Sequence, residues 1–221
     1  MDKKTEIIAS SLLFNGLPED QLKAVSAIAI EKRFGRNEDI FFEGDKADGF
    51  YMVADGRVKI YKMSFDGKEQ ILHIYGGGEP FGEVPVFNGR PYPANAVSLV
   101  KTTTFYFPRK EFVGLVRENS DLALNMLGML SLRLRQFAHQ VELLSLKEVP
   151  GRLASYLVYL AEEQGRQDKV TLDIPKGQLA SLLGTIPETL SRIFAKMSEE
   201  GLIKVEGKEI YLQDLEGLRE R

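Results

Sequence analysis

The stretch IPKGQLASLLGTIPETLSRIFAKMSEEGLI, residues 174 to 203, predicts two short helices joined by a tight turn. Gly184 can end the first helix, because glycine adopts the left-handed conformation without a steric penalty. The second helix, near residues 186 to 198, has an apolar face that can be buried against the first helix. The side chains of that face recur at helical spacing: Leu190, Ile193, Phe194 and Met197.

The opposite face of the second helix is polar where the helix begins. It presents a carboxylate, two hydroxyls and a guanidinium, from Glu188, Thr189, Ser191 and Arg192. Such groups can hydrogen-bond to base edges in the major groove of DNA. The alternative is a helical hairpin whose polar face is merely hydrated, because helical hairpins also occur in proteins with other functions.

Composition narrows the class of protein. The chain has 221 residues and a net charge of −3, which suits one or two globular domains. It has no cysteine, so disulfides, thiolate metal ligands and cysteine-bound iron–sulfur clusters are excluded. Residues 149–221 carry 10 Lys and Arg against 12 Asp and Glu. This balance counts against nucleic-acid binding in general, although a local basic face can coexist with an acidic remainder.

Two further classes of protein are disfavoured. The N-terminal residues lack the long apolar run of a signal peptide, and no apolar stretch is long enough to span a bilayer. We therefore expect a cytoplasmic protein without a membrane partner. We do not expect an enzyme, because a chain with no cysteine and two distant histidines shows no nucleophile–base pair and no metal-ligand cluster.

The pattern of secondary-structure signals changes along the chain. Residues 18–31 suggest a short amphipathic helix opened by Pro18. Residues 33–107 contain short β-rich runs, such as GFYMVADG and RVKIYKM, separated by glycine-containing turns. This spacing suggests an all-β roll or barrel. Helical patterns return at residues 109–117 and 121–147.

The long helix expected over 121–147 carries an apolar seam. The seam alternates steps of three and four residues: Leu127, Leu130, Leu134, Phe137, Val141 and Leu144. A heptad seam needs a partner, and a second copy of the helix can supply it. The alternative is packing of this helix on its own β-roll. Pro150 then interrupts the helix, and a further helix at 150–164 and a hairpin around Glu206-Gly207 are expected.

Four motifs, in their order and spacing, resemble the cyclic-AMP receptor protein and fumarate–nitrate regulator (CRP/FNR) superfamily over essentially the whole chain. They are Gly56-Arg57-Val58, Phe81-Gly82-Glu83, Gly151-Arg152-Leu153-Ala154 and ETLSR from Glu188 to Arg192. The resemblance implies an α+β fold with three parts. These are an N-terminal cyclic-nucleotide-binding-like β-roll that senses an effector (1–120), a long dimerisation helix (121–147) and a C-terminal winged helix-turn-helix (148–221). It also implies a homodimeric transcription factor with double-stranded DNA and RNA polymerase as partners.

The same resemblance implies roles for the polar residues of the second helix. Glu188 would accept a hydrogen bond from a cytosine amino group, and Arg192 would donate to guanine. Ser191 matches a serine of the fumarate–nitrate branch that helps to read the outer part of each half-site. Thr189 and Lys196 are expected to contact phosphates, which position the helix without specifying sequence.

Two neighbouring positions complicate this assignment. Thr185 and Glu188 are spaced as a capping box, in which the glutamate would bond back to the start of the helix. Pro187 replaces an arginine of the cyclic-AMP branch, so a phosphate contact of that type is lost. Both Thr185 and Pro187 are still expected to lie at the DNA interface.

The expected effector pocket contains Gly82, Glu83, Arg90 and Tyr92. The cyclic-AMP branch binds phosphate with an Arg-Ser pair, and the matching positions here hold Pro93 and Ala94. Cyclic AMP is therefore disfavoured, because a buried phosphate without a cationic partner is costly. Glu83 is then expected to bond to backbone near the short helix of the β-roll.

Three stretches, ILHIYG, SLK before the hinge and PETLSR, are most similar to the group that responds to nitric oxide and nitrosative stress. This group includes regulators of dissimilatory nitrate respiration and of the hybrid-cluster protein, and it implies haem as a candidate cofactor. The candidate axial ligands are His73 or His139, with Met52 and Met63.

Other interpretations stay open. Both histidines can be purely structural. The regulator can be gated by a small organic ligand instead of haem. In an alternative of another class, the β-roll senses a molecule and the C-terminal part recruits a protein without binding DNA.

Overall fold

The computed structural model describes residues 2–11, 13–84, 86 and 89–221, except for the side chains of residues 139 and 140. The chain divides into two compact units, Met1–Arg135 and Gln136–Arg221. No helix among the described residues combines the length and the continuous apolar run that a membrane crossing needs.

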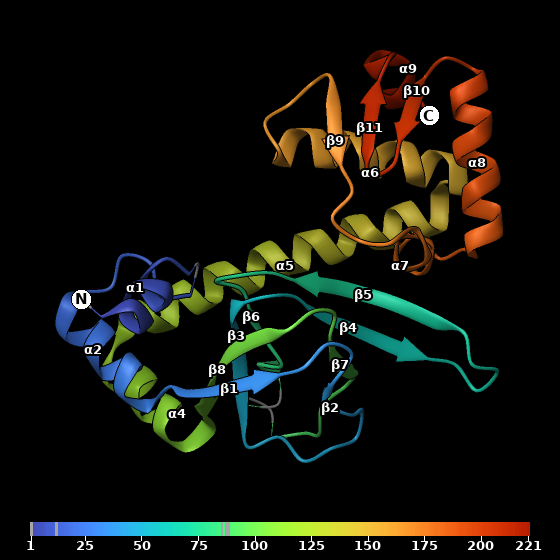
Figure 1. Cartoon of the computed structure of the whole chain (residues 1–221). Helices are drawn as coiled ribbons and strands as arrows, with labels where there is room; N and C mark the ends of the chain where they lie inside the picture. Colours follow the sequence, from blue (N-terminus) through green and yellow to red (C-terminus); the bar gives the residue numbers. More distant parts are fainter. Residues whose placement is uncertain (1, 12, 85, 87–88) are drawn as a thin grey trace. The chain divides into compact units, whose positions relative to one another are not determined.

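The first unit is built on two four-stranded sheets, which Figure 1 shows in blue to green. The strand orders are β1-β8-β3-β6 and β2-β7-β4-β5, and neighbouring strands run antiparallel. The β-roll expected from the glycine-punctuated runs is therefore confirmed. The strands are β1 (Ile30–Phe34), β2 (Asp39–Phe41), β3 (Gly49–Asp55), β4 (Val58–Met63), β5 (Glu69–Tyr75), β6 (Pro80–Phe81), β7 (Asn95–Ser98) and β8 (Thr102–Pro108).

The turn between β3 and β4 requires glycine. Gly56 has φ +98°, and a Cβ atom there would lie 2.5 Å from Thr102 Oγ1. The hydroxyl of Thr102 also accepts a hydrogen bond from the Arg57 amide at 3.2 Å. Gly56 thus allows the chain to reverse against the end of β8, since any side chain would collide there.

Helices pack on the β1-β8-β3-β6 sheet through an aromatic core. The rings of Phe50 and Phe107 stack at 4.9 Å, and Phe112 meets Phe50 edge-on at 4.6 Å. Phe14 joins the cluster 5.4 Å from Phe107. Among the described residues, the helices of this unit are α1 (Lys3–Ala9), α2 (Glu19–Ile28), α4 (Arg109–Glu118) and the first part of α5 (Ser120–Leu146).

The helix expected over residues 18–31 is shorter in the structure. It ends at Ile28, Ala29 is extended, and Ile30–Phe34 form strand β1 against β8. The prediction was wrong here because the ladder with Thr102–Tyr106 outweighs the local helical pattern. The helix α1 and the two-residue strand β6 were not predicted either, since both are too short to carry a periodic signal.

The second unit is a helix-turn-helix with a three-stranded wing, ordered β10-β11-β9 (Figure 1). The hairpin around Gly207 is confirmed, and Gly207 has φ +63° in its turn. The edge strand β9, only three residues long, was missed in the sequence. The elements are α6 (Val149–Glu163), β9 (Lys169–Thr171), α7 (Lys176–Leu182), α8 (Pro187–Glu199), β10 (Ile203–Glu206), β11 (Glu209–Leu212) and α9 (Leu215–Arg219).

Candidate DNA-binding face and effector site

The turn between α7 and α8 follows from Gly184. Its φ of +66° lets the chain leave α7, and the Thr185 amide then donates to the Ala180 carbonyl at 2.9 Å. This bond spans five residues and closes the end of α7 in the manner of a Schellman motif. The expected role of Gly184 is therefore confirmed.

Helix α8 separates an apolar from a polar face, as expected. Leu190, Ile193, Phe194 and Met197 are buried against the rest of the second unit. Four polar side chains of the expected interface stay exposed on α8: Glu188, Ser191, Arg192 and Lys196. Pro187 is exposed as well, whereas Thr185 and Thr189 are half-buried.

The capping alternative for Glu188 is not realised. The N-cap of α8 is Ile186, and no side chain caps this end of the helix. Thr185 lies one residue too early to form the capping box with Glu188. The Glu188 carboxylate therefore lies in the first turn of α8, where the helix dipole favours it.

Local contacts orient the two cations of α8. Arg192 Nη2 donates to Thr189 Oγ1 at 3.3 Å, one turn earlier on the same face. Lys196 Nζ lies 3.9 Å from Glu200 Oε1. The Thr189 hydroxyl and the Glu200 carboxylate are both partly exposed to solvent. Arg192 and Lys196 can therefore exchange these partners for groups of a nucleic acid.

Glu83 is buried in the β-roll, and its partner was not expected from the sequence. Arg133 of α5 donates from Nη1 to Glu83 Oε1 and from Nη2 to the Pro80 carbonyl. The guanidinium also lies 4.9 Å from the centre of the Tyr75 ring. Among the described residues the Glu83 side chain pairs with this cation and not with the backbone partner expected from the sequence, because a charged residue that is only 6 % exposed is costly to bury without a partner of opposite charge.

The ionisation of this group follows from its surroundings. Burial by itself would lower the pKa of Arg133, but Tyr75, Glu83 and Glu79 raise it overall. Burial also raises the pKa of the Tyr75 hydroxyl to about 12. Arg133 is therefore held as a cation between a carboxylate and a neutral ring.

Glu79 and His73 lie beside this cluster. His73 Nε2 is 3.8 Å from Glu79 Oε1, and the Gly76 amide donates to Glu79 Oε2 at 2.7 Å. Burial alone would raise the pKa of Glu79, but His73, the Gly76 amide and Arg133 lower it overall. This contact with the Glu79 carboxylate gives His73 a structural role, which was one of the two interpretations left open by the sequence.

The other candidate haem ligands do not gather around His73. Met52 is fully buried in the aromatic core, and Met63 lies exposed at the end of β4. The side chain of His139 lies outside the described residues. Among the residues that the structure describes, no group of three or more metal-ligating side chains was found.

Tyr92 and Gly82 belong to the inner wall of the roll. The Tyr92 ring stacks on Phe41 at 3.7 Å, and its hydroxyl donates to the Gly49 carbonyl at 2.9 Å. A Cβ atom on Gly82 would lie 3.1 Å from the Tyr92 ring. Burial raises the pKa of Tyr92. Arg90, the fourth residue expected in the pocket, is exposed.

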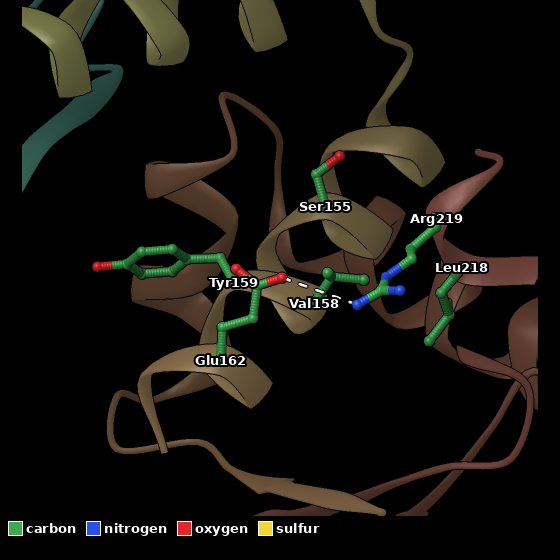
Figure 2. Close-up of a pocket in the computed structure, with 6 residues that line it drawn as sticks. All are labelled: Ser155, Val158, Tyr159, Glu162, Leu218 and Arg219. Atoms are coloured by element: carbon green, nitrogen blue, oxygen red, sulfur yellow. Dashed lines mark ion pairs between the residues drawn. The ribbon is translucent and has the colours of Figure 1, made fainter. Parts of the chain in front are cut away.

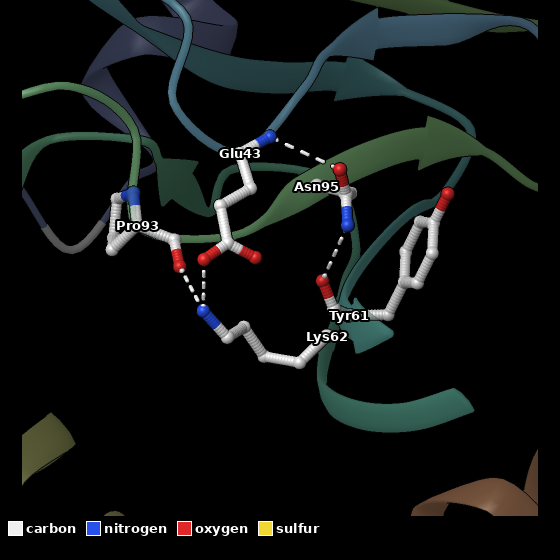
Figure 3. Close-up of polar contacts among 5 residues, drawn as sticks. All are labelled: Glu43, Tyr61, Lys62, Pro93 and Asn95. Atoms are coloured by element: carbon white, nitrogen blue, oxygen red, sulfur yellow. Dashed lines mark hydrogen bonds and ion pairs between the residues drawn. The ribbon is translucent and has the colours of Figure 1, made fainter. Parts of the chain in front are cut away.

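The loop before β7 contacts a cation from β4 (Figure 3). Lys62 Nζ donates to the Pro93 carbonyl at 3.0 Å and pairs with Glu43. Asn95 Oδ1 accepts from the Glu43 amide at 3.0 Å, and its Nδ2 donates to the Tyr61 carbonyl. The sequence comparison with the cyclic-AMP branch could not show Lys62 beside this loop, because it lies 31 residues away from Pro93.

A shallow pocket lies on the second unit, between α6 and α9 (Figure 2). Arg219 and Glu162 form an ion pair of 3.9 Å across it. None of the site residues expected from the sequence lines this pocket.

The seam of α5 is exposed in the single chain. Leu134 is 71 % exposed, Val141 62 % and Leu127 61 %. Leu130 and Phe137 are exposed as well, and Leu144 is half-buried. Large apolar side chains in a continuous row on one helix usually mark an interface.

Comparison with known proteins agrees with this architecture. The family model for the cyclic nucleotide-binding domain matches residues 31–119, and the one for the Crp-like helix-turn-helix domain matches residues 151–221. The "Cyclic AMP receptor protein" of Thermus thermophilus is 31 % identical over 88 % of this chain and 89 % of its own. The "CRP-like cAMP-activated global transcriptional regulator" of Mycobacterium tuberculosis is 29 % identical over 98 % of both chains.

Solved structures show the same fold. FixK2 from Bradyrhizobium japonicum has a TM-score of 0.76 at 23 % identity, covering 87 % of this chain and 96 % of its own. A CooA mutant from Carboxydothermus hydrogenoformans has a TM-score of 0.78 at 22 % identity, covering 100 % of this chain and 96 % of its own.

A β-roll of cyclic-nucleotide-binding type, a long helix and a winged helix-turn-helix with a polar recognition face define a DNA-binding transcription regulator. The chain belongs to the CRP/FNR family. It is therefore a regulator and not an enzyme, and dimerisation is typical of its family. The finer resemblance to the nitric-oxide-responsive group has no support from these relatives.

Proposed function

We propose that this chain acts as a homodimer that reads a palindromic DNA site through α8, cooperates with RNA polymerase and is gated by a small organic ligand in the β-roll. The observation that carries the DNA part is the face of α8 formed by Glu188, Ser191 and Arg192. These side chains are exposed within five residues, directly opposite a buried apolar face. A protein-docking helix would present apolar anchors on this face instead.

The roles of these residues follow from their chemistry. Arg192 offers two parallel donors to guanine, and Glu188 accepts from the cytosine of a neighbouring pair. Ser191 reads the outer part of the half-site. Thr189 and Lys196 contact phosphates, and Thr189 also steers Arg192 through their hydrogen bond of 3.3 Å. Half-sites resembling TTGAT or TTGTGA are expected.

A binding series over single-base variants of the half-site tests the DNA part. Arg192→Ala should lose about 1–3 kcal/mol at one base pair and relax the preference for its guanine. The matched control, Lys196→Ala, should weaken binding to all variants alike. It should also reduce the slope of log affinity against log salt concentration by about one. Equal losses of affinity for every variant with Arg192→Ala would make Arg192 a phosphate contact and overturn the assignment.

The ligand part rests on the cluster of Glu83 and Arg133. A ligand that takes the Arg133 guanidinium must offer an acceptor, and it must also donate a hydrogen bond to the Glu83 carboxylate that it leaves behind. A small polar organic molecule satisfies both demands. Haem fits less well, because its candidate ligands His73, Met52 and Met63 are not gathered at one place.

Cyclic AMP is the effector in the names of the two curated relatives. In this chain Pro93 and Ala94 stand at the phosphate-binding positions, and the nearby Lys62 is already paired with Glu43. We expect calorimetry to show weak or no binding of cyclic AMP, and a micromolar affinity would contradict our alignment of this loop. An absorption spectrum with haem tests the other alternative: a Soret band that shifts with nitric oxide would favour the gas sensor over the organic ligand.

A further inference from the structure

The Arg152 side chain donates hydrogen bonds to three backbone carbonyls, which lie at the C-terminal ends of α5 and α7. Its Nε donates to the Lys147 carbonyl at 2.9 Å, and its Nη2 donates to the Leu144 carbonyl at 2.9 Å. Its Nη1 donates to the Leu183 carbonyl at 3.0 Å. The first two acceptors lie at the C-terminal end of α5, and the third is the last residue before the turn at Gly184. All of these residues lie in the second unit.

The chemistry of these acceptors explains why an arginine is suited to this place. The last carbonyls of a helix lack partners within the helix and carry a partial negative charge. A guanidinium has five donors fixed in one plane, so it can serve three such carbonyls at once. Lysine presents a compact ammonium group on a flexible stem and cannot reproduce this fork.

The third acceptor connects the fork to the DNA-binding face. The Leu183 carbonyl directly precedes Gly184, whose φ of +66° sets the direction in which the chain enters α8. The same segment is fixed on its other side by the Thr185 amide, which bonds to the Ala180 carbonyl. Arg152 therefore connects the last turn of α5 directly to the segment that leads into the recognition helix.

We propose that Arg152 is a positioning residue that couples the last turn of α5 to the turn between α7 and α8. It contacts no base, and it transmits the state of the long helix to α8 in both directions. Because coupling between two sites is reciprocal, DNA bound at α8 must also stabilise the last turn of α5. The proposal rests on DNA binding by α8 as described above.

Hydrogen exchange on the full chain tests the coupling. The DNA is a palindrome selected from a random pool by the wild-type protein. In the wild type, DNA should slow amide exchange both in α8 and in residues 143–147, the latter by about fivefold or more. In Arg152→Met the slowing in residues 143–147 should be lost, whereas the slowing in α8 persists. Affinity should fall by about fivefold or more, yet the preference among single-base variants should stay.

Two further variants separate coupling from charge and from folding. Arg152→Lys keeps the charge and should lose most of the transmitted slowing, and it carries the same test if Arg152→Met does not fold. Arg166→Met removes an arginine from the loop after α6 and should behave as the wild type. Slowing in residues 143–147 that survives in Arg152→Met, or an Arg152→Lys protein that equals the wild type, would overturn the proposal. Absence of DNA binding in the wild type would instead refute the proposed function.

Discussion

The pair of Glu83 and Arg133 shows how one buried charge organises the β-roll. Their side chains are 7 % and 14 % exposed, so neither charge can be satisfied by water. Arg133 also serves the Pro80 carbonyl and covers the Tyr75 ring. A single guanidinium thus joins α5 to strands β5 and β6 within the first unit.

Removing one member of this pair should be costly. Arg133→Met leaves the Glu83 carboxylate buried and unpaired, so we expect the β-roll to lose about 3 kcal/mol of its free energy of unfolding. Near-UV circular dichroism during urea unfolding can measure this loss, because five of the eight tyrosines lie between residues 51 and 106.

Two controls accompany this measurement. The double variant Glu83→Gln with Arg133→Met removes both charges and should recover most of the loss. Arg33→Met breaks the pair with Glu31, whose side chains are 76 % and 46 % exposed, and should cost less than about 1 kcal/mol. A double variant as unstable as Arg133→Met would mean that the Pro80 and Tyr75 contacts, and not the ion pair, stabilise this site.

At the scale of elements, α5 has two apolar sides, of which one is buried in the first unit and the other is exposed. Leu122, Met126 and Met129 are buried in the core of the first unit. The seam that contains Leu134 is exposed along the same helix. The spacing of these apolar residues along the sequence predicts the seam. A second copy of α5 packed against it would bury the leucines.

Leu134→Glu should convert the protein to monomers that no longer bind the palindrome. The carboxylate would meet its own symmetry mate in an apolar interface, where burial of unpaired charge is strongly unfavourable. Analytical ultracentrifugation measures the change. Leu132→Glu is a matched control, since Leu132 is 51 % exposed on the same helix but lies off the seam. A Leu134→Glu dimer, or equal dissociation of both variants, would place the interface elsewhere.

At the scale of the whole molecule, the proposed homodimer would bring two copies of α8 to two half-sites. Residues 149–221 carry 10 Lys and Arg against 12 Asp and Glu, so their general attraction to DNA is weak. In that arrangement we expect specific binding to depend on both recognition helices docking at once. The half-sites should lie one helical turn apart, about 34–36 Å, as two-fold symmetric helix-turn-helix proteins require.

Insertions between the half-sites test this geometry. Five added base pairs place the half-sites on opposite faces of the helix, so we expect nearly complete loss of specific binding in a mobility-shift assay. Ten added base pairs return the two half-sites to the same face of the DNA but double the distance between them, so binding should stay weak. Undiminished affinity with either insertion would show that each α8 binds independently.

Local patterns determined the helix-turn-helix and the roll from the sequence alone. In α8 the burial of Leu190 and Met197 and the turn at Gly184 follow from helical periodicity and from the backbone freedom of glycine. Both signals involve residues within one or two turns of each other, so no tertiary information was needed. The resemblance of four short motifs then placed these elements in one family.

Long-range pairing was decided only by the tertiary structure. Arg133 lies 50 residues away from Glu83 and 53 residues away from Pro80, the two residues that accept its hydrogen bonds, and the carbonyl of Leu183 is 31 residues away from Arg152. The end of α2 depended on the ladder between β1 and β8, which joins Ile30 to Tyr106. A sequence encodes which residues are apolar or charged along one element, whereas the partner of a buried charge depends on which elements the folded chain brings together.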